Sequence, residues 1–145
     1  MFTNNEMIMI FSSKMQINAR PEKVWAKYAN VQEWSSWDSE VREAYLNKGL
    51  SLSSEGFLIP RKGPKASIRV VQFEENRNFT VQSKLPLCRL NFEHYITDMN
   101  GSSAVEHKIV FTGVLAPLFS RLIGRQIYKA MPDTLSALKI SVEGN

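Results

Sequence analysis

The chain has 145 residues, of which 43% are hydrophobic, and this size and composition are typical of one soluble globular domain over residues 1–145. Its 18 Lys and Arg residues against 14 Asp and Glu give a net charge of +4 that is spread along the chain and identifies no partner by itself. The single cysteine, Cys88, excludes an internal disulfide and a cysteine-based metal cluster. Residues 1–14 lack the basic start of a signal peptide, and no apolar run approaches the ~20 residues of a membrane span. We therefore expect a cytoplasmic protein without integral membrane association.

The first expected element is a strand over residues 7–17, because apolar side chains fall on one face and Lys14 and Gln16 on the other. Pro21 then suits the first turn of a helix, where its missing N–H is not needed. The apolar residues that share one side after it are Val24, Tyr28, Val31, Trp34 and Trp37. They predict one helix followed by its end or by a short second helix.

Six further strands are expected between residues 41 and 115, separated by turns rich in Gly, Pro and Asn. Their ranges are 41–46, 56–59, 66–73, 79–85, 88–97 and 104–115. The remaining segment carries the apolar stripe of a long amphipathic helix, and Gly124 and Pro132 predict a bend near residues 128–132. One strand, a helical excursion, six strands and a closing helix make an α+β domain whose antiparallel sheet buries one face against that helix.

This order of elements resembles the START/Bet v 1-like (SRPBCC) superfamily, and within it the polyketide cyclase/dehydrase-like proteins. The likeness is carried by "ARPEKVWAKYANVQEWSSW", residues 19–37, and by "EHKIVFTGVLAPLFSRLIGRQIYKAMPDTLSALK", residues 106–139. It implies a helix-grip fold, in which a curved antiparallel seven-stranded sheet wraps around a long C-terminal helix, with short N-terminal helices between the first two strands. It also implies a cavity for hydrophobic ligands, in which some members carry out cyclisation or dehydration.

The only two histidines, His94 and His107, stand at the ends of a segment centred on Asn100-Gly101. If that dipeptide is the two-residue turn of a hairpin, each pair of facing residues sums to 201, and His94 lies opposite His107. The same register places Phe92 by Ile109 and Leu90 by Phe111, so the face that carries the histidines is apolar.

Several interpretations of this pair remain open. The imidazoles can complete a polar spot in the core, or they can line a cavity and orient the carbonyl or hydroxyl group of a ligand. As a third alternative, they can supply acid–base catalysis, because no other obvious base shares their face. A metal site is the weakest interpretation, since no third ligand follows with recognisable spacing.

Other residues are weaker candidates. Trp34 is expected as a wall at the cavity mouth, although aromatic residues at helical spacing are more often core. The loop of residues 59–65 carries Arg61, Lys62 and Lys65, which could meet an anionic ligand or a membrane headgroup, although a solvated hairpin tip is the favoured interpretation. Cys88 is interpreted as a small buried hydrophobe. The face of Arg69 is undecided, because it lies between Ile68 and Val70 in an apolar strand.

The leading function is that of a binding module for a small, largely hydrophobic ligand that is aromatic, polyketide-like or lipid-like. It would be held between the sheet and the C-terminal helix, with His94 and His107 as its polar handle. The expected walls are Phe92, Ile109, Phe111, Ile127 and Met131. The alternatives are a cyclase or dehydratase that uses the histidine pair, and an accessory protein whose surface does the work. The sequence shows no cofactor motif, no Gly-rich phosphate loop and no pattern for nucleic acid, and it does not set the oligomeric state.

Overall fold

The computed structural model describes residues 7–144, so the ends of the expected 1–145 domain, and part of the segment 1–14, lie outside the described residues. Seven antiparallel strands form one sheet in the order β1-β7-β6-β5-β4-β3-β2. The strands are β1 (Met7–Ile17), β2 (Val41–Leu46), β3 (Glu55–Pro60), β4 (Ala66–Glu74), β5 (Asn78–Leu85), β6 (Cys88–Asp98) and β7 (Ser103–Gly113). The expected α+β class with a seven-stranded antiparallel sheet is confirmed.

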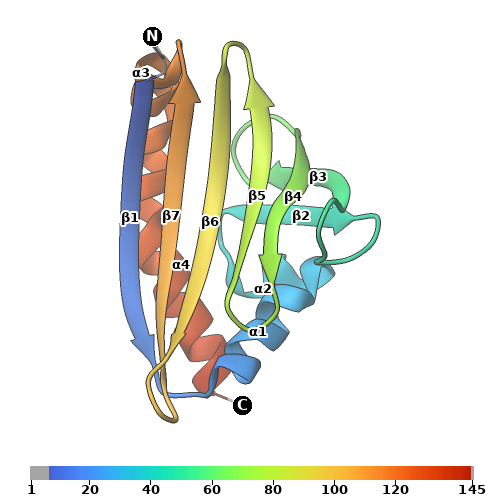
Figure 1. Ribbon diagram of the computed structural model, residues 1–145, viewed down its shortest axis with the longest axis vertical. Helices are drawn as coiled ribbons and strands as arrows, with labels where there is room; N and C mark the ends of the chain where they lie inside the picture. Colours follow the sequence, from blue (N-terminus) through green and yellow to red (C-terminus); the bar gives the residue numbers. More distant parts are fainter. Residues whose placement is uncertain (1–6, 145) are drawn as a thin grey trace, which may run out of the picture.

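The helices follow the expected order as well. They are α1 (Pro21–Ala29), η1 (Val31–Glu33), α2 (Trp34–Trp37), α3 (Ala116–Phe119), the π-helical segment η2 (Ser120–Gly124) and α4 (Arg125–Glu143). Figure 1 shows α4 crossing the sheet behind β1 and β7, while β2 and β3 turn across the line of β4 and β5. The sheet therefore curls around the helix, which is the helix-grip arrangement that the resemblance implied.

Two boundaries differ from the sequence prediction. The last strand ends at Gly113 rather than at residue 115, because Gly113 has a φ of +117° and takes the chain out of the sheet. The irregular backbone of the long helix lies at residues 120–124, and α4 continues as one helix through Pro132, so the bend near residues 128–132 stays a prediction. The helical segment packs closely against the sheet at Gly124, because this residue has no Cβ atom. A Cβ atom there would lie 3.0 Å from the Phe11 ring and 3.1 Å from the Phe111 ring.

The β6–β7 hairpin has the register that the turn predicts. The Met99 N–H donates to the Ser102 carbonyl over 2.8 Å, and both Asn100 and Gly101 have positive φ angles, as a primed turn requires. His94 lies directly opposite His107. The predicted pairing of the two histidines is confirmed.

Among the described residues, the buried hydrophobic side chains form two clusters. The first joins the sheet to α1, α2 and the C-terminal half of α4, and includes Trp34, Ile96 and Val105. The second joins the sheet to α3, η2 and the start of α4, and includes Ile109 and Met131. The two clusters hold the helix against the sheet along its length.

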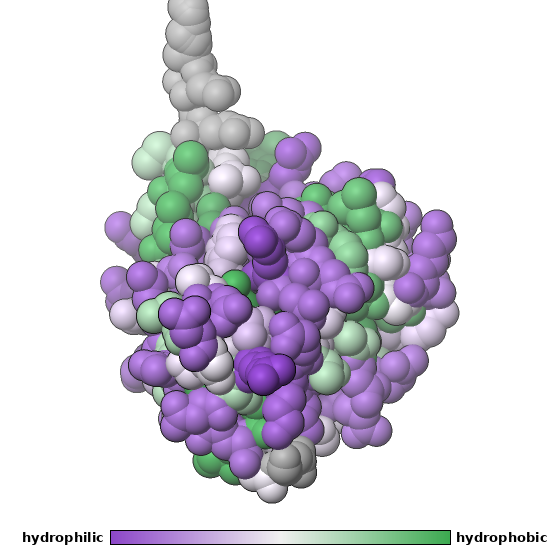
Figure 2. Space-filling model, turned by 60° about the horizontal axis from the view of Figure 1, so that its bottom comes forward, coloured by the Kyte–Doolittle hydropathy of each residue, from purple (hydrophilic) through white to green (hydrophobic). Residues whose placement is uncertain are grey.

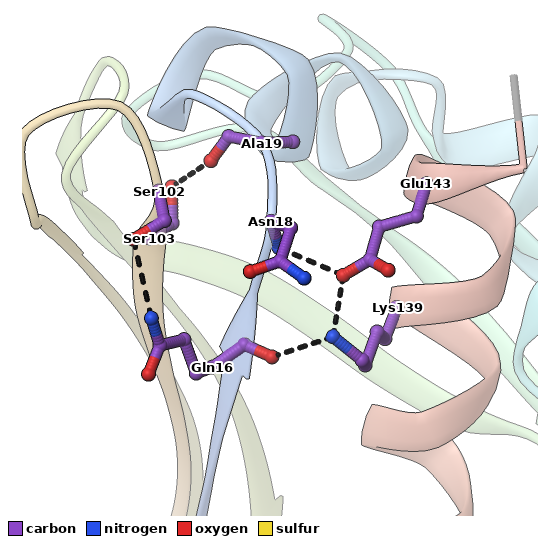
Figure 3. A network of polar contacts seen from close by, with 7 residues as sticks. All are labelled: Gln16, Asn18, Ala19, Ser102, Ser103, Lys139 and Glu143. Atoms are coloured by element: carbon purple, nitrogen blue, oxygen red, sulfur yellow. Dashed lines mark hydrogen bonds and ion pairs between the residues drawn. The ribbon is translucent and has the colours of Figure 1, made fainter.

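Polar contacts fasten the end of α4 to the first strand. The end of the molecule that Figure 2 brings forward is mostly hydrophilic. There the Glu143 carboxylate accepts a hydrogen bond from the Asn18 N–H and pairs with Lys139, which also donates to the Gln16 carbonyl (Figure 3). The Ser103 hydroxyl donates to the Ala19 carbonyl over 2.7 Å. These contacts fix the closing helix relative to β1 and to the hairpin.

Candidate functional site

The two histidine rings face each other on the side of the sheet that the helices cover. Their centroids are 4.7 Å apart and their planes are inclined by 71°. The Tyr28 hydroxyl of α1 lies 2.7 Å from Nε2 of His107, within hydrogen-bonding distance. His94 Nδ1 lies 3.3 Å from the Phe79 carbonyl oxygen, which can only accept, so this nitrogen carries the proton. Both imidazoles are therefore anchored to protein groups.

Burial keeps both rings neutral. It lowers the pKa of His94 from 6.5 to about 4, against a smaller opposing effect of hydrogen bonds to the Phe79 and Phe92 carbonyls. Burial also lowers the pKa of His107 well below its usual value, and the neighbouring His94 lowers it further. At neutral pH the pair can exchange hydrogen bonds with a ligand without carrying charge.

An aromatic cage fixes the orientation of the pair. The Phe79 ring stacks on His94 with a centroid distance of 4.0 Å and an inclination of 5°. Trp34 in turn stacks on Phe79 at 6.2 Å. The rings of His94 and His107 therefore have little freedom to rotate, and any ligand must meet them in this geometry.

Further polar groups converge from α1, α2 and α4. The Thr134 hydroxyl donates a hydrogen bond to the Asp38 carboxyl, whose pKa is raised from 3.8 to about 6, chiefly by burial. The pKa of Tyr28 is raised by burial and then by the charge of Asp38. Nearby, the indole Nε1 of Trp37 is buried and has no hydrogen-bond partner among the described residues. Such a donor is costly to bury unless something accepts from it.

These polar groups together are called the polar cluster. It consists of the side chains of His94, His107 and Asp38 and the hydroxyl groups of Tyr28 and Thr134. It lies where the two hydrophobic clusters meet. On β7, His107 stands between Val105 of the first cluster and Ile109 of the second, and on α4 Thr134 stands between Leu135 and Met131. A layer of neutral and weakly acidic groups therefore interrupts the apolar interior.

On the inward face of β6, the two residues beside this layer are only partly buried. Leu90 and Ile96 are buried, whereas Phe92 and His94 between them keep partial exposure. Ile123 and Ile127, both in the C-terminal helical segment, are also only partly buried, and they pack with Phe92 against the second cluster. Phe92 and His94 therefore keep some contact with solvent beside the polar cluster.

The predicted site residues fall into two groups. Ile109, Phe111 and Met131 lie in the second cluster, Phe92 and Ile127 pack against it, and the role of these residues as walls of a ligand site stays a prediction. Trp34 does not lie at a cavity mouth, because it is 7% exposed, packs in the first cluster and donates from its indole to the Tyr28 carbonyl over 2.8 Å. The expectation for Trp34 as a wall at the mouth is thus corrected.

The weaker candidates also have definite places. Arg69 is exposed while Ile68 and Val70 are buried, so its side chain points away from the interior. Cys88 is buried, as expected, and burial raises the pKa of its thiol. The basic loop of residues 59–65 is largely exposed, with the Lys65 ammonium 4.2 Å from the centroid of the Phe57 ring.

Sequence reasoning missed the polar role of Tyr28, Trp37, Asp38 and Thr134. The apolar stripe of α1 indicated that Tyr28 is buried, and it is, but helical spacing says nothing about which group its hydroxyl meets. The signal that was available is the acidic residue of "WSSWDSE", a carboxylate directly after two buried tryptophans.

The curled antiparallel sheet, the closing helix and the polar cluster between them define a protein of the helix-grip class. The family model described as "Polyketide cyclase / dehydrase and lipid transport" matches residues 9–143, so the chain belongs to this family. Comparison with functionally curated proteins gives no significant match.

Solved structures share the fold at low sequence identity. Ara h 8.0201 superposes with a TM-score of 0.74 at 9% identity, covering 96% of this chain and 100% of that one. Norcoclaurine synthase from Thalictrum flavum, in complex with dopamine and hydroxybenzaldehyde, gives 0.73 at 9% identity, covering 97% and 89%. A START superfamily protein from Mycobacterium smegmatis gives 0.67 at 13% identity, covering 93% and 97%. No helix in residues 7–144 is long and apolar enough to cross a membrane.

Proposed function

We propose that this protein binds a small, largely apolar ligand between the sheet and α4, beside the polar cluster. The observation that carries the proposal is the partial exposure of Phe92 and His94 on an inward face whose flanking residues are buried. Partly exposed apolar side chains around a few convergent polar groups are typical of small-molecule sites. Ile123 and Ile127 would form the opposite wall of this site.

The chemistry of the polar cluster indicates what the ligand carries. A charged ligand group would have to be desolvated among groups that burial keeps neutral, which disfavours it. A carbonyl or hydroxyl group can bond to an imidazole, and a carbonyl could also accept from the unpartnered Trp37 indole. We therefore propose an aromatic, polyketide-like or lipid-like ligand with one neutral polar end.

The first experiment is native mass spectrometry of protein purified from its host, followed by binding of the identified compound. Ile127→Trp should fill the site and abolish binding, while Gln126→Trp, on the neighbouring exposed position, should leave binding unchanged. His107→Gln should weaken binding by about 1 kcal/mol, the value of one neutral hydrogen bond. If the Ile127→Trp variant bound the compound with the affinity of the wild type, the proposed location of the ligand site would be refuted.

The competing function is a cyclase or dehydratase. Its support is the approach of two imidazoles to 4.7 Å, with the Tyr28 hydroxyl on one of them. Acid–base catalysis by such a pair typically contributes ~100- to 10,000-fold in rate. The test is conversion of a poly-keto compound by the wild type. Loss of this conversion in both His94→Gln and His107→Gln, in variants that stay folded and still bind the compound, would favour the enzyme over the binder.

A further inference from the structure

The end of the molecule that carries the β5–β6 turn exposes apolar side chains. Leu87 in the turn is 70% exposed, Val114 after β7 is 62% exposed, and Leu122 in η2 is 63% exposed. Figure 1 shows that this turn, the end of β7, α3 and the start of β1 all lie at one end, opposite the C-terminus. In Figure 2, hydrophobic side chains gather beside the start of β1, in contrast to the hydrophilic end that faces the viewer.

The turn holds its apolar residue in an unfavourable conformation. Leu87 follows Pro86 and has a φ of +51°, a position that normally takes Gly or Asn. Its carbonyl accepts a hydrogen bond from the Leu115 N–H over 3.1 Å, and a Cβ atom on Gly113 would lie only 2.6 Å from that carbonyl oxygen. The turn is therefore fixed against the β7–α3 connection, and it presents a large exposed leucine where stability alone would favour a small or polar residue.

Cations surround these apolar side chains. Lys84 and Arg89 face each other across the β5–β6 ladder, both are exposed, and neither belongs to a salt bridge in the part of the chain that the structure describes. Like charges directly opposite each other are destabilising unless an anion lies between them. A hollow of about 340 Å³ opens here, and Lys84, Leu87, Arg89 and Val114 contribute to its lining.

The helical segment next to the turn continues the same pattern. Leu118 and Leu122 are exposed one turn apart, and Arg121 and Arg125 are exposed beside them. Residues 79–92 and 107–132 contain no Asp or Glu. We call the exposed side chains of this end the basic apolar end. Its members are Lys84, Leu87, Arg89, Val114, Leu118, Arg121, Leu122 and Arg125.

We propose that the basic apolar end docks the protein on a lipid bilayer that contains anionic lipids. Apolar side chains interleaved with cations, in described segments that contain no Asp or Glu, complement such a surface, since the cations meet lipid phosphates while the leucines enter the interface. Leu87 is the leading inserted residue, and Lys84 and Arg89 bind phosphates at the hollow. Ile123 of the proposed ligand site directly follows Leu122, so docking would bring that site close to the membrane.

Vesicle co-sedimentation tests this proposal, with phosphatidylcholine vesicles compared with vesicles that also contain phosphatidylglycerol. Wild-type protein should bind the anionic vesicles and release them at high salt. The double substitution Lys84→Gln and Arg89→Gln should weaken partition roughly 30-fold, about fivefold for each cation near the surface. The matched control, Lys48→Gln with Lys62→Gln, removes the same charge from exposed positions elsewhere and should leave partition nearly unchanged.

A second pair of variants tests the apolar contribution. Leu87→Asn should weaken partition about tenfold through lost apolar burial. The control Leu52→Asn, at an exposed leucine in the β2–β3 connection, should have no effect. Because asparagine tolerates positive φ, Leu87→Asn should also raise the melting temperature, which shows that lost binding is not lost folding.

Three results would overturn the proposal. They are equal binding to neutral and anionic vesicles, equal losses in the two charge variants, and a wild-type dimer that Leu87→Asn converts to a monomer. The last result would assign the basic apolar end to a second copy of the chain. Binding of the small ligand by the Leu87→Asn variant should match the wild type, so failure of this proposal and failure of the ligand site are distinguishable.

Discussion

Acidification should destabilise this protein well above the pH at which ordinary carboxylates protonate, because two imidazoles are buried in neutral form. In the unfolded chain each histidine binds a proton as the pH falls through its ordinary pKa of 6.5, whereas in the folded chain the pKa of His94 is about 4 and that of His107 is also lowered. The unfolded state then binds more protons than the folded state, so stability falls between these pKa values. Asp38 acts in the opposite sense, since its pKa is raised to about 6 and its burial penalty is relieved as it protonates.

The magnitude follows from the pKa shifts of His94 and Asp38. Between about pH 7.5 and about pH 5, a pKa lowered from 6.5 to about 4 removes roughly 2 kcal/mol of unfolding free energy through His94. His107 adds a loss in the same direction. Over the same interval Asp38, with its pKa raised from 3.8 to about 6, returns roughly 1.4 kcal/mol. The wild type should therefore lose stability, with the two histidines outweighing the single carboxyl.

Urea denaturation at the two pH values measures this balance, and two variants separate its parts. His94→Gln combined with His107→Gln should reverse the sign, so that the protein gains roughly 1.4 kcal/mol on acidification through Asp38 alone. Asp38→Asn should deepen the loss by the same amount. A wild type whose unfolding free energy is constant or rises on acidification would refute the reasoning, as would a histidine variant that keeps the wild-type loss.

Three smaller changes test the supports of the site. Tyr28→Phe leaves the buried Nε2 of His107 without its hydroxyl partner and should cost about 1–3 kcal/mol in urea denaturation, whereas an unchanged midpoint would mean that water replaces the hydroxyl. Gly124→Ala forces a Cβ atom against the fully buried Phe111 ring, so we expect a net loss of about 1 kcal/mol by the same measurement despite the gain in helix propensity, and a rise in stability would contradict this packing. Glu143→Gln should lower the melting temperature slightly, by removing the ion pair with Lys139. Because the Glu143 pKa is lowered in the folded state, the difference from the wild type should vanish as the wild-type carboxyl protonates, and a difference that persists in acid would contradict the ion pair as its cause.

The turn and the register of the β6–β7 hairpin could be predicted from the sequence because two local signals agreed. Asn100-Gly101 specifies a primed two-residue turn, and the alternation of apolar residues around His94 and His107 allows only one register. The end of β7 could not be placed in the same way, since the apolar Val114 and Leu115 continue the strand pattern after Gly113 has turned the chain away. Apolar periodicity marks which residues are buried more reliably than where a strand stops.

Only the two histidines of the polar cluster could be predicted from the sequence, for a different reason. The histidine pair is a property of one hairpin, whereas Tyr28, Asp38 and Thr134 come from three helical segments whose relative placement depends on tertiary packing. Trp34 shows the same limit, because its helical spacing predicts burial but not that its indole bonds to the Tyr28 carbonyl inside the core. When the residues of a site come from several helices and strands, they show no characteristic spacing in the sequence.

The state of the histidine pair bears on the choice between binder and enzyme. A general base is most effective when its pKa lies near the working pH, and a base with a pKa of about 4 is a weak proton acceptor at neutral pH. The raised pKa of Tyr28 makes its hydroxyl a weaker acid in the same way. Burial thus weakens both groups as catalysts but preserves them as neutral hydrogen-bond partners. A hydrogen bond between a ligand and a desolvated imidazole or hydroxyl is stronger than the same bond in water. If turnover exists, neither imidazole should impose a pH dependence on its rate in the ordinary histidine range, because burial lowers the pKa of both, and Asp38, with a pKa of about 6, is the group of the polar cluster that titrates there. A rate that rises through the ordinary histidine range, and still does so in the Asp38→Asn variant, would require a ligand that brings the imidazole pKa back toward neutrality.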